Sequence, residues 1–265
     1  MRIIAAAALL VLTAPLAHAD IPDLPLDTLL APICKDARAS VGCPTCACEA
    51  VTQTPPGNWS SVSDLTHALV VWVHGELSPG RAANLYVAAL GGEKGFKYGG
   101  ILADASGLGR PEEPFFAEAE VRGAESFMDM CPGACPHDPV GPVHFYLVKQ
   151  TLTARSDDYK DTETTTETLV PCFEQGGALA CYRVPISESV VRKIPQLEPG
   201  NKEKILSKSG WKRKWSIGGP IGMELVLGKA SGTGKHNLKD RPHVKDGHTF
   251  FHVLATRPDV TPLPR

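Results

Sequence analysis

The sequence lacks the short motifs that mark common catalytic centres. It contains no G-x-S-x-G nucleophile elbow, no H-E-x-x-H zinc motif, no phosphate-binding P-loop and no G-x-G-x-x-G placed after a strand. These absences argue against the familiar serine hydrolases, zinc proteases and nucleotide-binding enzymes. No enzymatic function is therefore predicted from a motif.

Long apolar runs are also missing after the N-terminus, so no later stretch predicts a membrane span. The N-terminal segment contains Arg2, an apolar stretch over residues 3–12 and an Ala17-His18-Ala19 cleavage pattern. Together these features are typical of a secretory signal. That stretch is well short of the roughly 20 residues that cross a bilayer. Residue 20 is aspartate rather than cysteine, so the bacterial lipoprotein pattern is absent. We expect a soluble protein that is secreted or periplasmic.

Cysteine is not scarce, and all eight cysteines follow the predicted signal. An even number of cysteines in an exported chain predicts structural disulfides, because oxidising compartments consume free thiols. The residues expected to form them are Cys34, Cys43, Cys46, Cys48, Cys131, Cys135, Cys172 and Cys181.

The Cys43-Pro-Thr-Cys46-Ala-Cys48 motif has two further interpretations. A Cys-x-x-Cys pair exchanges disulfides when its first thiol is acidified at a helix N-terminus. Three neighbouring thiolates can instead hold a soft metal such as copper or zinc. The segment lacks the preceding strand and the following helix of a thiol oxidoreductase, so we interpret it as a structural staple.

The clearest secondary structure lies between residues 142 and 185. Residues 143–153 are rich in β-branched and aromatic side chains and predict a strand, as do residues 169–173 and 179–184. Gly176-Gly177 can adopt the positive φ angles of a tight hairpin turn. We expect an antiparallel meander with a disulfide between Cys172 and Cys181, and with the polar residues 156–167 as a connection.

Other segments also favour strands. Residues 65–73 form the most apolar run after the signal and predict a buried central strand. Further strands are predicted over residues 96–103, 114–122, 204–207, 211–217, 221–227 and 248–256.

Helix formation is considered for three segments and is predicted for two of them. Residues 78–90 fit a helix capped by Ser78 and ended by Gly91, whereas residues 84–90 alone fit a strand; we favour the helix. Residues 187–194 predict a short helical turn. Residues 20–33 are expected to be extended, because their prolines oppose a helix.

These segments define the fold class. We predict a mostly β protein with antiparallel β-sandwich-like sheets, one or two short helices and disulfide staples. The expected organisation is a signal peptide over residues 1–19, a Cys/Pro-rich N-terminal lead-in over 20–64 and a β-rich body over 65–265. The body divides into two candidate halves, 65–139 and 140–265.

The net charge of −2 conceals an uneven distribution. Residues 20–199 hold 13 Lys and Arg against 24 Asp and Glu, whereas residues 200–265 hold 13 against 5. A basic section can bind polyanions or pack beside acidic parts of its own chain. We favour the second arrangement and expect no nucleic-acid partner.

Two sets of side chains suggest chemistry. Imidazoles clustered near the C-terminus could bind zinc or copper, and the candidate ligands are His236, His243, His248 and His252. His248 and His252 are four residues apart, whereas two ligands on one strand are usually two apart, so we expect no bound cofactor. Glutamates between residues 112 and 125 could form the carboxylate pair of a glycosidase, but surface glutamates on a half-exposed strand are the common explanation, which we favour.

From these features we predict an exported, disulfide-bonded protein without catalytic activity that binds a protein or a glycan, for example at a cell surface. The first alternative is a secreted hydrolase that uses a metal or a carboxylate pair. The second alternative is a periplasmic factor that handles thiols or metals.

Overall fold

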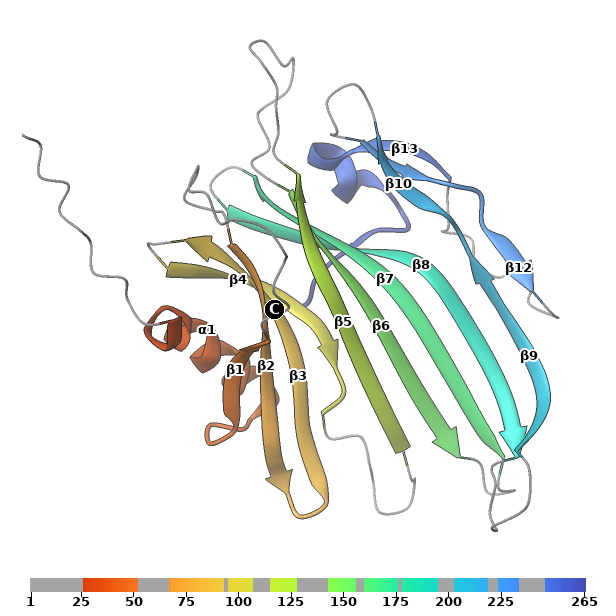
Figure 1. Ribbon diagram of the computed structural model, residues 1–265, viewed down its shortest axis with the longest axis horizontal. Coiled ribbons are helices and arrows are strands. Elements are labelled where there is room, and N and C mark those ends of the chain that lie inside the picture. Colours follow the sequence, from red (N-terminus) through yellow and green to blue (C-terminus); the bar gives the residue numbers. More distant parts are fainter. Residues whose placement is uncertain are drawn as a thin grey trace, which may run out of the picture.

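The computed structural model describes residues 26–51, 67–92, 95–106, 115–127, 143–155, 160–175, 178–194, 203–218, 224–233 and 246–265. The described strands form three antiparallel sheets that pack in layers, with one helix on the outside (Figure 1). The predicted mostly β, disulfide-stapled sandwich is therefore confirmed. Within the described ranges, no helix combines the length and the apolar character that a membrane crossing requires.

The first sheet has four strands in the order β1-β2-β3-β4. They are β1 (Ala47–Val51), β2 (His67–Ser78), β3 (Arg81–Gly92) and β4 (Gly95–Asp104). β2 lies inside the sheet, as the apolar run over residues 65–73 predicted. Residues 65 and 66 of that run lie outside the described residues.

The helix favoured over residues 78–90 is wrong, because β3 occupies this segment. Leu85 and Val87 are buried on one face of β3, and Ala88 and Leu90 are buried on the other. The sequence of a strand that is covered on both faces is a continuous apolar run and does not alternate between apolar and polar residues. The alanines of this run favour a helix locally, but strand pairing on both sides decides the structure.

The extended structure expected over residues 20–33 is wrong from residue 26 onward, because α1 (Leu26–Val41) is a helix with Pro32 inside it; residues 20–25 lie outside the described residues. Pro32 is exposed and removes one backbone hydrogen bond of the helix. Packing opposes that cost: a buried stripe with helical spacing contacts the outer face of the four-stranded sheet, and its members are Leu30, Ile33, Cys34 and Ala37. The helix therefore forms because burial of the apolar stripe stabilises it by more than Pro32 destabilises it.

The second sheet is larger and has the order β12-β9-β8-β7-β6-β5, with β14 paired to β8. Its long strands are β5 (Phe115–Phe127), β6 (Val143–Arg155), β7 (Asp161–Gln175), β8 (Ala178–Ile194) and β9 (Lys204–Lys212). β12 (Ser231–Thr233) and β14 (Thr261–Pro262) are short. This sheet contains the predicted meander β6-β7-β8; the Gly176-Gly177 turn itself lies outside the described residues.

β7 and β8 extend beyond the predicted strands. The polar segment over residues 156–167 is not simply a connection, since β7 begins at Asp161 and continues through a threonine-rich stretch. Threonine is β-branched and suits a half-buried sheet, and the hydroxyls of Thr151 and Thr165 form a cross-strand hydrogen bond of 3.1 Å. The helical turn predicted over residues 187–194 is wrong, because this segment continues β8 and pairs with β7 and β9.

The third sheet is small, with the order β10-β11-β13. It consists of β10 (Trp215–Gly218), β11 (Glu224–Leu227) and β13 (Gly247–Phe250), and the 3-10 helix η2 (Phe251–Thr256) follows directly. The closing strand predicted over residues 248–256 is thus correct only as far as Phe250.

The large sheet lies between two cores. On one face, Tyr146 and Val170 pack against Val70 and Leu90 of the four-stranded sheet. On its other face, Phe145 and Phe173 pack against the small sheet and η2; the rings of Phe145 and Phe251 meet edge to face at 5.4 Å. The layers are therefore helix, four-stranded sheet, large sheet and small sheet.

Residues 261–265, here called the C-terminal strap, join the first two sheets. Thr261 and Pro262 pair with β8, and the Leu263 amide donates to the Cys181 carbonyl at 3.0 Å. On the other side, the Ile101 amide of β4 donates to the Pro264 carbonyl at 2.8 Å. The strap therefore forms hydrogen bonds with both sheets and places its last residue, Arg265, between them.

Candidate ligand-binding pocket

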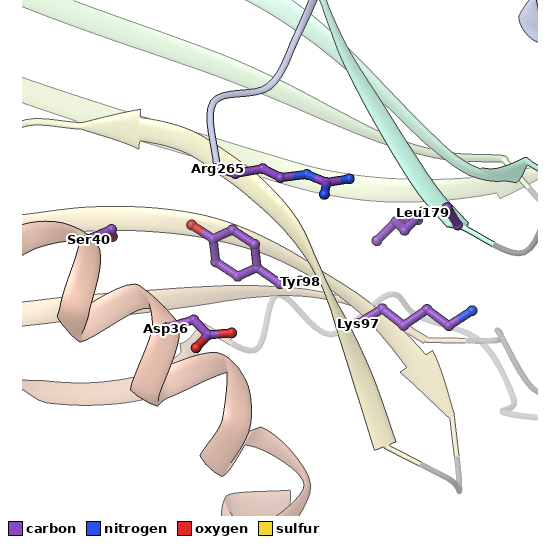
Figure 2. Close-up of a pocket in the computed structure, with 7 residues that line it drawn as sticks. Asp36, Ser40, Lys97, Tyr98, Leu179 and Arg265 are labelled. Atoms are coloured by element: carbon purple, nitrogen blue, oxygen red, sulfur yellow. The ribbon is translucent and has the colours of Figure 1, made fainter.

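A pocket of about 440 Å³ lies where α1, β4, the start of β8 and the C-terminal strap meet (Figure 2). Its volume is within the range of small-molecule sites. The residues that line it are Asp36, Ser40, Lys97, Tyr98, Ala178, Leu179 and Arg265.

The fold explains why these side chains converge. Asp36 and Ser40 are four residues apart, so they lie above one another on the same side of α1. Lys97 and Tyr98 are neighbours on β4, an edge strand, so their side chains leave opposite faces of the sheet. The pocket consequently wraps around the edge of β4.

The Tyr98 hydroxyl is the most unusual group in the pocket. Its oxygen is buried and has no hydrogen-bond partner of acceptable geometry among the described residues. Ser40 lies nearby, but its hydroxyl already donates to the Ala37 carbonyl at 2.8 Å. Burial raises the pKa of Tyr98; the Ser40 hydroxyl partly offsets this rise, and the charge of Asp36 adds to it. Leaving a buried hydroxyl unsatisfied costs about 1–3 kcal/mol, which a bound ligand can recover.

The charges in the pocket are separated. Figure 2 shows the Lys97 and Arg265 side chains extending toward Leu179, whereas the Tyr98 hydroxyl points toward Ser40 on α1. The Asp36 carboxylate also comes from α1. The pocket thus offers a cationic end beside an apolar side chain and an end that carries hydroxyls and a carboxylate.

The predicted cysteines form structural disulfides where the chain is described. The pairs are Cys34–Cys48, Cys43–Cys46 and Cys172–Cys181. Cys131 and Cys135 lie outside the described residues.

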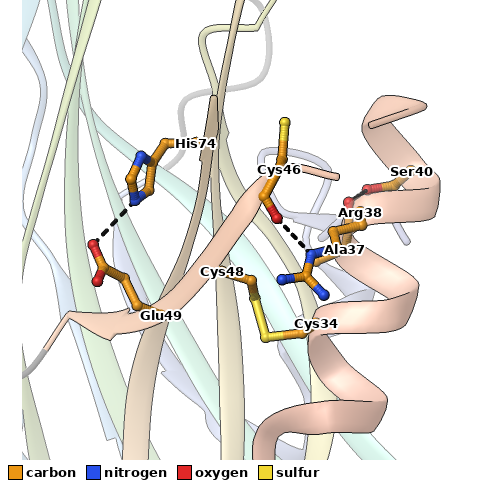
Figure 3. The surroundings of a disulfide bond; sticks show 8 residues. All are labelled: Cys34, Ala37, Arg38, Ser40, Cys46, Cys48, Glu49 and His74. Carbon is orange, nitrogen blue, oxygen red and sulfur yellow. Dashed lines mark hydrogen bonds and ion pairs between the residues drawn. A yellow bond between two sulfur atoms is a disulfide. The ribbon is translucent and has the colours of Figure 1, made fainter. Parts of the chain in front are cut away.

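The surroundings of the Cys43–Cys46 disulfide differ from those of a redox site. Both residues are buried, and they follow the end of α1 instead of preceding a helix. Arg38 of α1 donates to the Cys46 carbonyl at 2.7 Å, and the Cys34–Cys48 disulfide ties α1 to β1 (Figure 3). This arrangement is a staple between the helix and the sheet.

The histidines are not brought together in the part of the chain that is described. His248 on β13 contacts the Glu224 carboxylate at 3.0 Å and is exposed. His252 belongs to η2 rather than to the same strand, and His236 and His243 lie outside the described residues. Among described side chains, no group of three or more His, Cys, Asp and Glu residues could hold a metal ion. The metal site stays a prediction.

Two further polar clusters lie away from the pocket. On β2, His74 stacks on Trp72 with ring centroids 3.8 Å apart. The His74 ring also bonds to the Glu49 carboxylate at 3.1 Å (Figure 3). Tyr86 stacks parallel to Trp72 on the neighbouring strand at 6.0 Å. Neighbouring rings thus stack on Trp72, so this cluster holds the strands together.

The second cluster is a buried ion pair. Arg213 donates to the Asp259 carboxylate at 2.8 Å and to the Pro185 carbonyl at 2.8 Å. Arg257 binds the same carboxylate at 3.0 and 3.1 Å. Burial opposes ionisation of Asp259, but the hydrogen bonds from Arg257 and Arg213 outweigh it and lower the pKa of this carboxyl. The cluster ties the segment after η2 to β8.

Sequence reasoning did not identify the pocket. Asp36, Lys97 and Arg265 look like ordinary surface charges, and only the i, i+4 spacing of Asp36 and Ser40 places two of the lining residues together. Some of the glutamates considered as a carboxylate pair precede β5 and lie outside the described residues. The others lie on β5, whose side chains are not described, so the carboxylate pair stays a prediction.

Comparisons with protein-family models, curated proteins and solved structures found no match, so the function must be inferred from the geometry of the pocket.

Proposed function

We propose that this protein is an exported binding protein that holds an acidic sugar, such as the uronic acid of a glycan, in the pocket between α1, β4, β8 and the C-terminal strap. The predicted secretory signal and the structural disulfides support export. The observation that carries the proposal is the buried, unsatisfied Tyr98 hydroxyl beside separated cationic and acidic groups.

The chemistry of the pocket favours a ligand with one anionic group and several hydroxyls. Lys97 and Arg265 supply donors for a carboxylate, and Arg265 can bind it through two hydrogen bonds. Asp36, Ser40 and Tyr98 supply acceptors and donors for hydroxyls. A sugar acid carries both kinds of group within a small molecule.

The same residues support binding rather than bond cleavage. Hydrolysis of a glycosidic bond usually employs a pair of carboxyl groups on opposite sides of that bond. Asp36 is the one carboxylate side chain among the described residues that line the pocket. The arrangement therefore supports recognition without cleavage.

Calorimetric titration of the exported protein with digalacturonic acid tests the proposal, and its dimethyl ester is the matched neutral ligand. We expect binding of the acid, and about tenfold weaker binding of the ester because the charge-assisted hydrogen bonds are lost. Lys97→Ala should weaken binding of the acid to a similar extent, whereas the control Lys35→Ala, on α1 but outside the pocket lining, should not.

Tyr98→Phe gives an independent measurement. The substitution removes a buried hydroxyl that has no hydrogen-bond partner among the residues the structure describes, so the stability of the free protein should stay the same or rise. Affinity for the acid should fall by about three- to tenfold because the ligand's hydrogen bond is lost. Equal affinities for acid and ester, or no effect of either pocket variant, would refute the proposal.

A further inference from the structure

The first half of β9 is not covered by any element in the described ranges. Residues 203–208 are all exposed, and they include two large apolar side chains, Ile205 at 60 % and Leu206 at 41 % exposure. β8 pairs with β9 along one edge, whereas β12 pairs along the other edge only at residues 210–212. Within the described strands, the outer backbone edge of residues 204–209 thus has no neighbour.

A β-bulge accounts for the exposed pair. Arg192 of β8 is opposite Ser207, but Lys193 is opposite Ile205, so Leu206 is an extra residue on β9. The bulge breaks the alternation of the strand, and two adjacent apolar side chains reach solvent.

The same strand carries unneutralised positive charge. Lys204, Lys208 and Lys212 are exposed and form no ion pair with any described residue. The nearby acidic groups are already engaged, because Lys193 binds Glu163 at 3.0 Å and Glu203 at 3.2 Å. Successive lysines four residues apart on a strand are separated by about 13 Å.

Lysines and a bulge are also the devices that protect an edge strand from unwanted pairing. A strand that is only protected has no reason to expose two large aliphatic side chains near its start. The combination of a backbone edge that pairs with no described strand, an apolar pair and flanking lysines instead matches recognition by strand addition, in which backbone bonds give affinity and side chains give specificity.

We propose that the outer edge of β9 binds an extended acidic segment of a partner protein as an added strand. A second copy of this chain fits poorly, because it would place lysines against lysines. A polyanion would use the lysines but neither the backbone edge nor the apolar pair. This surface lies at the end of β8 opposite the pocket, so the inference is independent of the proposed sugar site.

Fluorescence anisotropy with a labelled peptide of four Glu-Val repeats tests the proposal. We expect saturable binding, and about tenfold weaker binding by the protein variant Lys204→Glu/Lys208→Glu. Leu206→Ser should weaken binding in the same direction, and Lys149→Glu on β6 serves as the matched charge control with no effect. Thermal unfolding of each variant verifies that the fold is retained.

Two N-methylated versions of the peptide separate strand addition from simple charge attraction. One carries methyl groups on the amides of the glutamates and the other on those of the valines, so only one of them blocks the pairing edge. Strand addition predicts that one version loses about tenfold or more in affinity while the other retains it. Equal binding of both, absence of binding by the parent peptide, or equally tight binding of heparin that is insensitive to Leu206→Ser would overturn the proposal.

Discussion

Removal of the Asp259 carboxylate should destabilise the protein more than removal of its partner Arg213. The side chains of Arg213 and Asp259 are 0 % and 1 % exposed, so both charges are fully withdrawn from water. Asp259→Ala deprives Arg213 and Arg257 of a shared carboxylate at once. Breaking a buried pair in this way costs about 3–5 kcal/mol, because the remaining charge stays in a poorly solvating environment.

Removal of Arg213 has a different effect from removal of Asp259, because Asp259 keeps a partner. After Arg213→Met, Asp259 still accepts two hydrogen bonds from Arg257, at 3.0 and 3.1 Å, so its charge stays compensated. The losses are the bonds from Arg213 to Asp259 and to the Pro185 carbonyl, and a methionine side chain fills part of the vacated space. We expect a cost of about 1–3 kcal/mol.

Urea unfolding with the disulfides intact measures both values, and unchanged m-values establish that the unfolded states are comparable. The double variant should be no less stable than Asp259→Ala alone, because removing Arg213 also removes the uncompensated buried charge. A cost for Arg213→Met equal to or larger than that for Asp259→Ala would refute this reasoning.

Three further predictions concern a disulfide, a glycine with positive φ and the pH dependence of stability. Cys172→Ala/Cys181→Ala should lower the free energy of unfolding by about 2–3 kcal/mol, and peptide mapping that links Cys172 elsewhere in the unmodified protein would contradict the observed pair. Gly100→Ala should cost about 2 kcal/mol or more, because φ is +118° and the new Cβ would lie 2.7 Å from a strap side chain; Gly80→Ala, at φ +77° in open space, should cost only about 1 kcal/mol. Because the pKa of Asp259 is lower in the folded than in the unfolded protein, its ionisation stabilises the fold above the unfolded pKa, and this stabilisation is lost as the pH falls. Asp259→Asn should therefore reduce the fall in the free energy of unfolding between about pH 5 and about pH 3. An equally steep fall in the variant would exclude this carboxyl as its source.

The strands that sequence reasoning located share one property. Residues 143–153 and 179–184 combine β-branched or aromatic side chains with a regular place inside a sheet, so local preference and tertiary pairing agree. The same agreement made the Cys172–Cys181 pair predictable, since the two cysteines are directly opposite in the β7–β8 register.

The failures arise where local and tertiary effects disagree. Pro32 opposes a helix, and its local signal hid the stripe that runs from Leu30 to Ala37. The charged side chains at the end of β8 resemble a helix with a capping serine, yet pairing on both edges makes them a strand. Propensity is a weak guide where neighbouring strands supply most of the stabilisation.

The pocket was unpredictable for a different reason. Asp36, Tyr98, Leu179 and Arg265 come from four segments far apart along the chain, and each is unremarkable in its own segment. Only the packing of the helix, two sheets and the strap places them around one space. An unsatisfied hydroxyl such as that of Tyr98 is a property of the folded surroundings and has no sequence signal.

The C-terminal strap also determines when the pocket can form. Ile101 and Cys181 acquire their bonds to Pro264 and Leu263 only after every strand from β5 to β13 has been synthesised. For a chain that crosses a membrane from its N-terminus onward, α1 and the first sheet would emerge early, with the edge of β4 still uncovered. Ligand capture would then be confined to molecules whose translocation is finished.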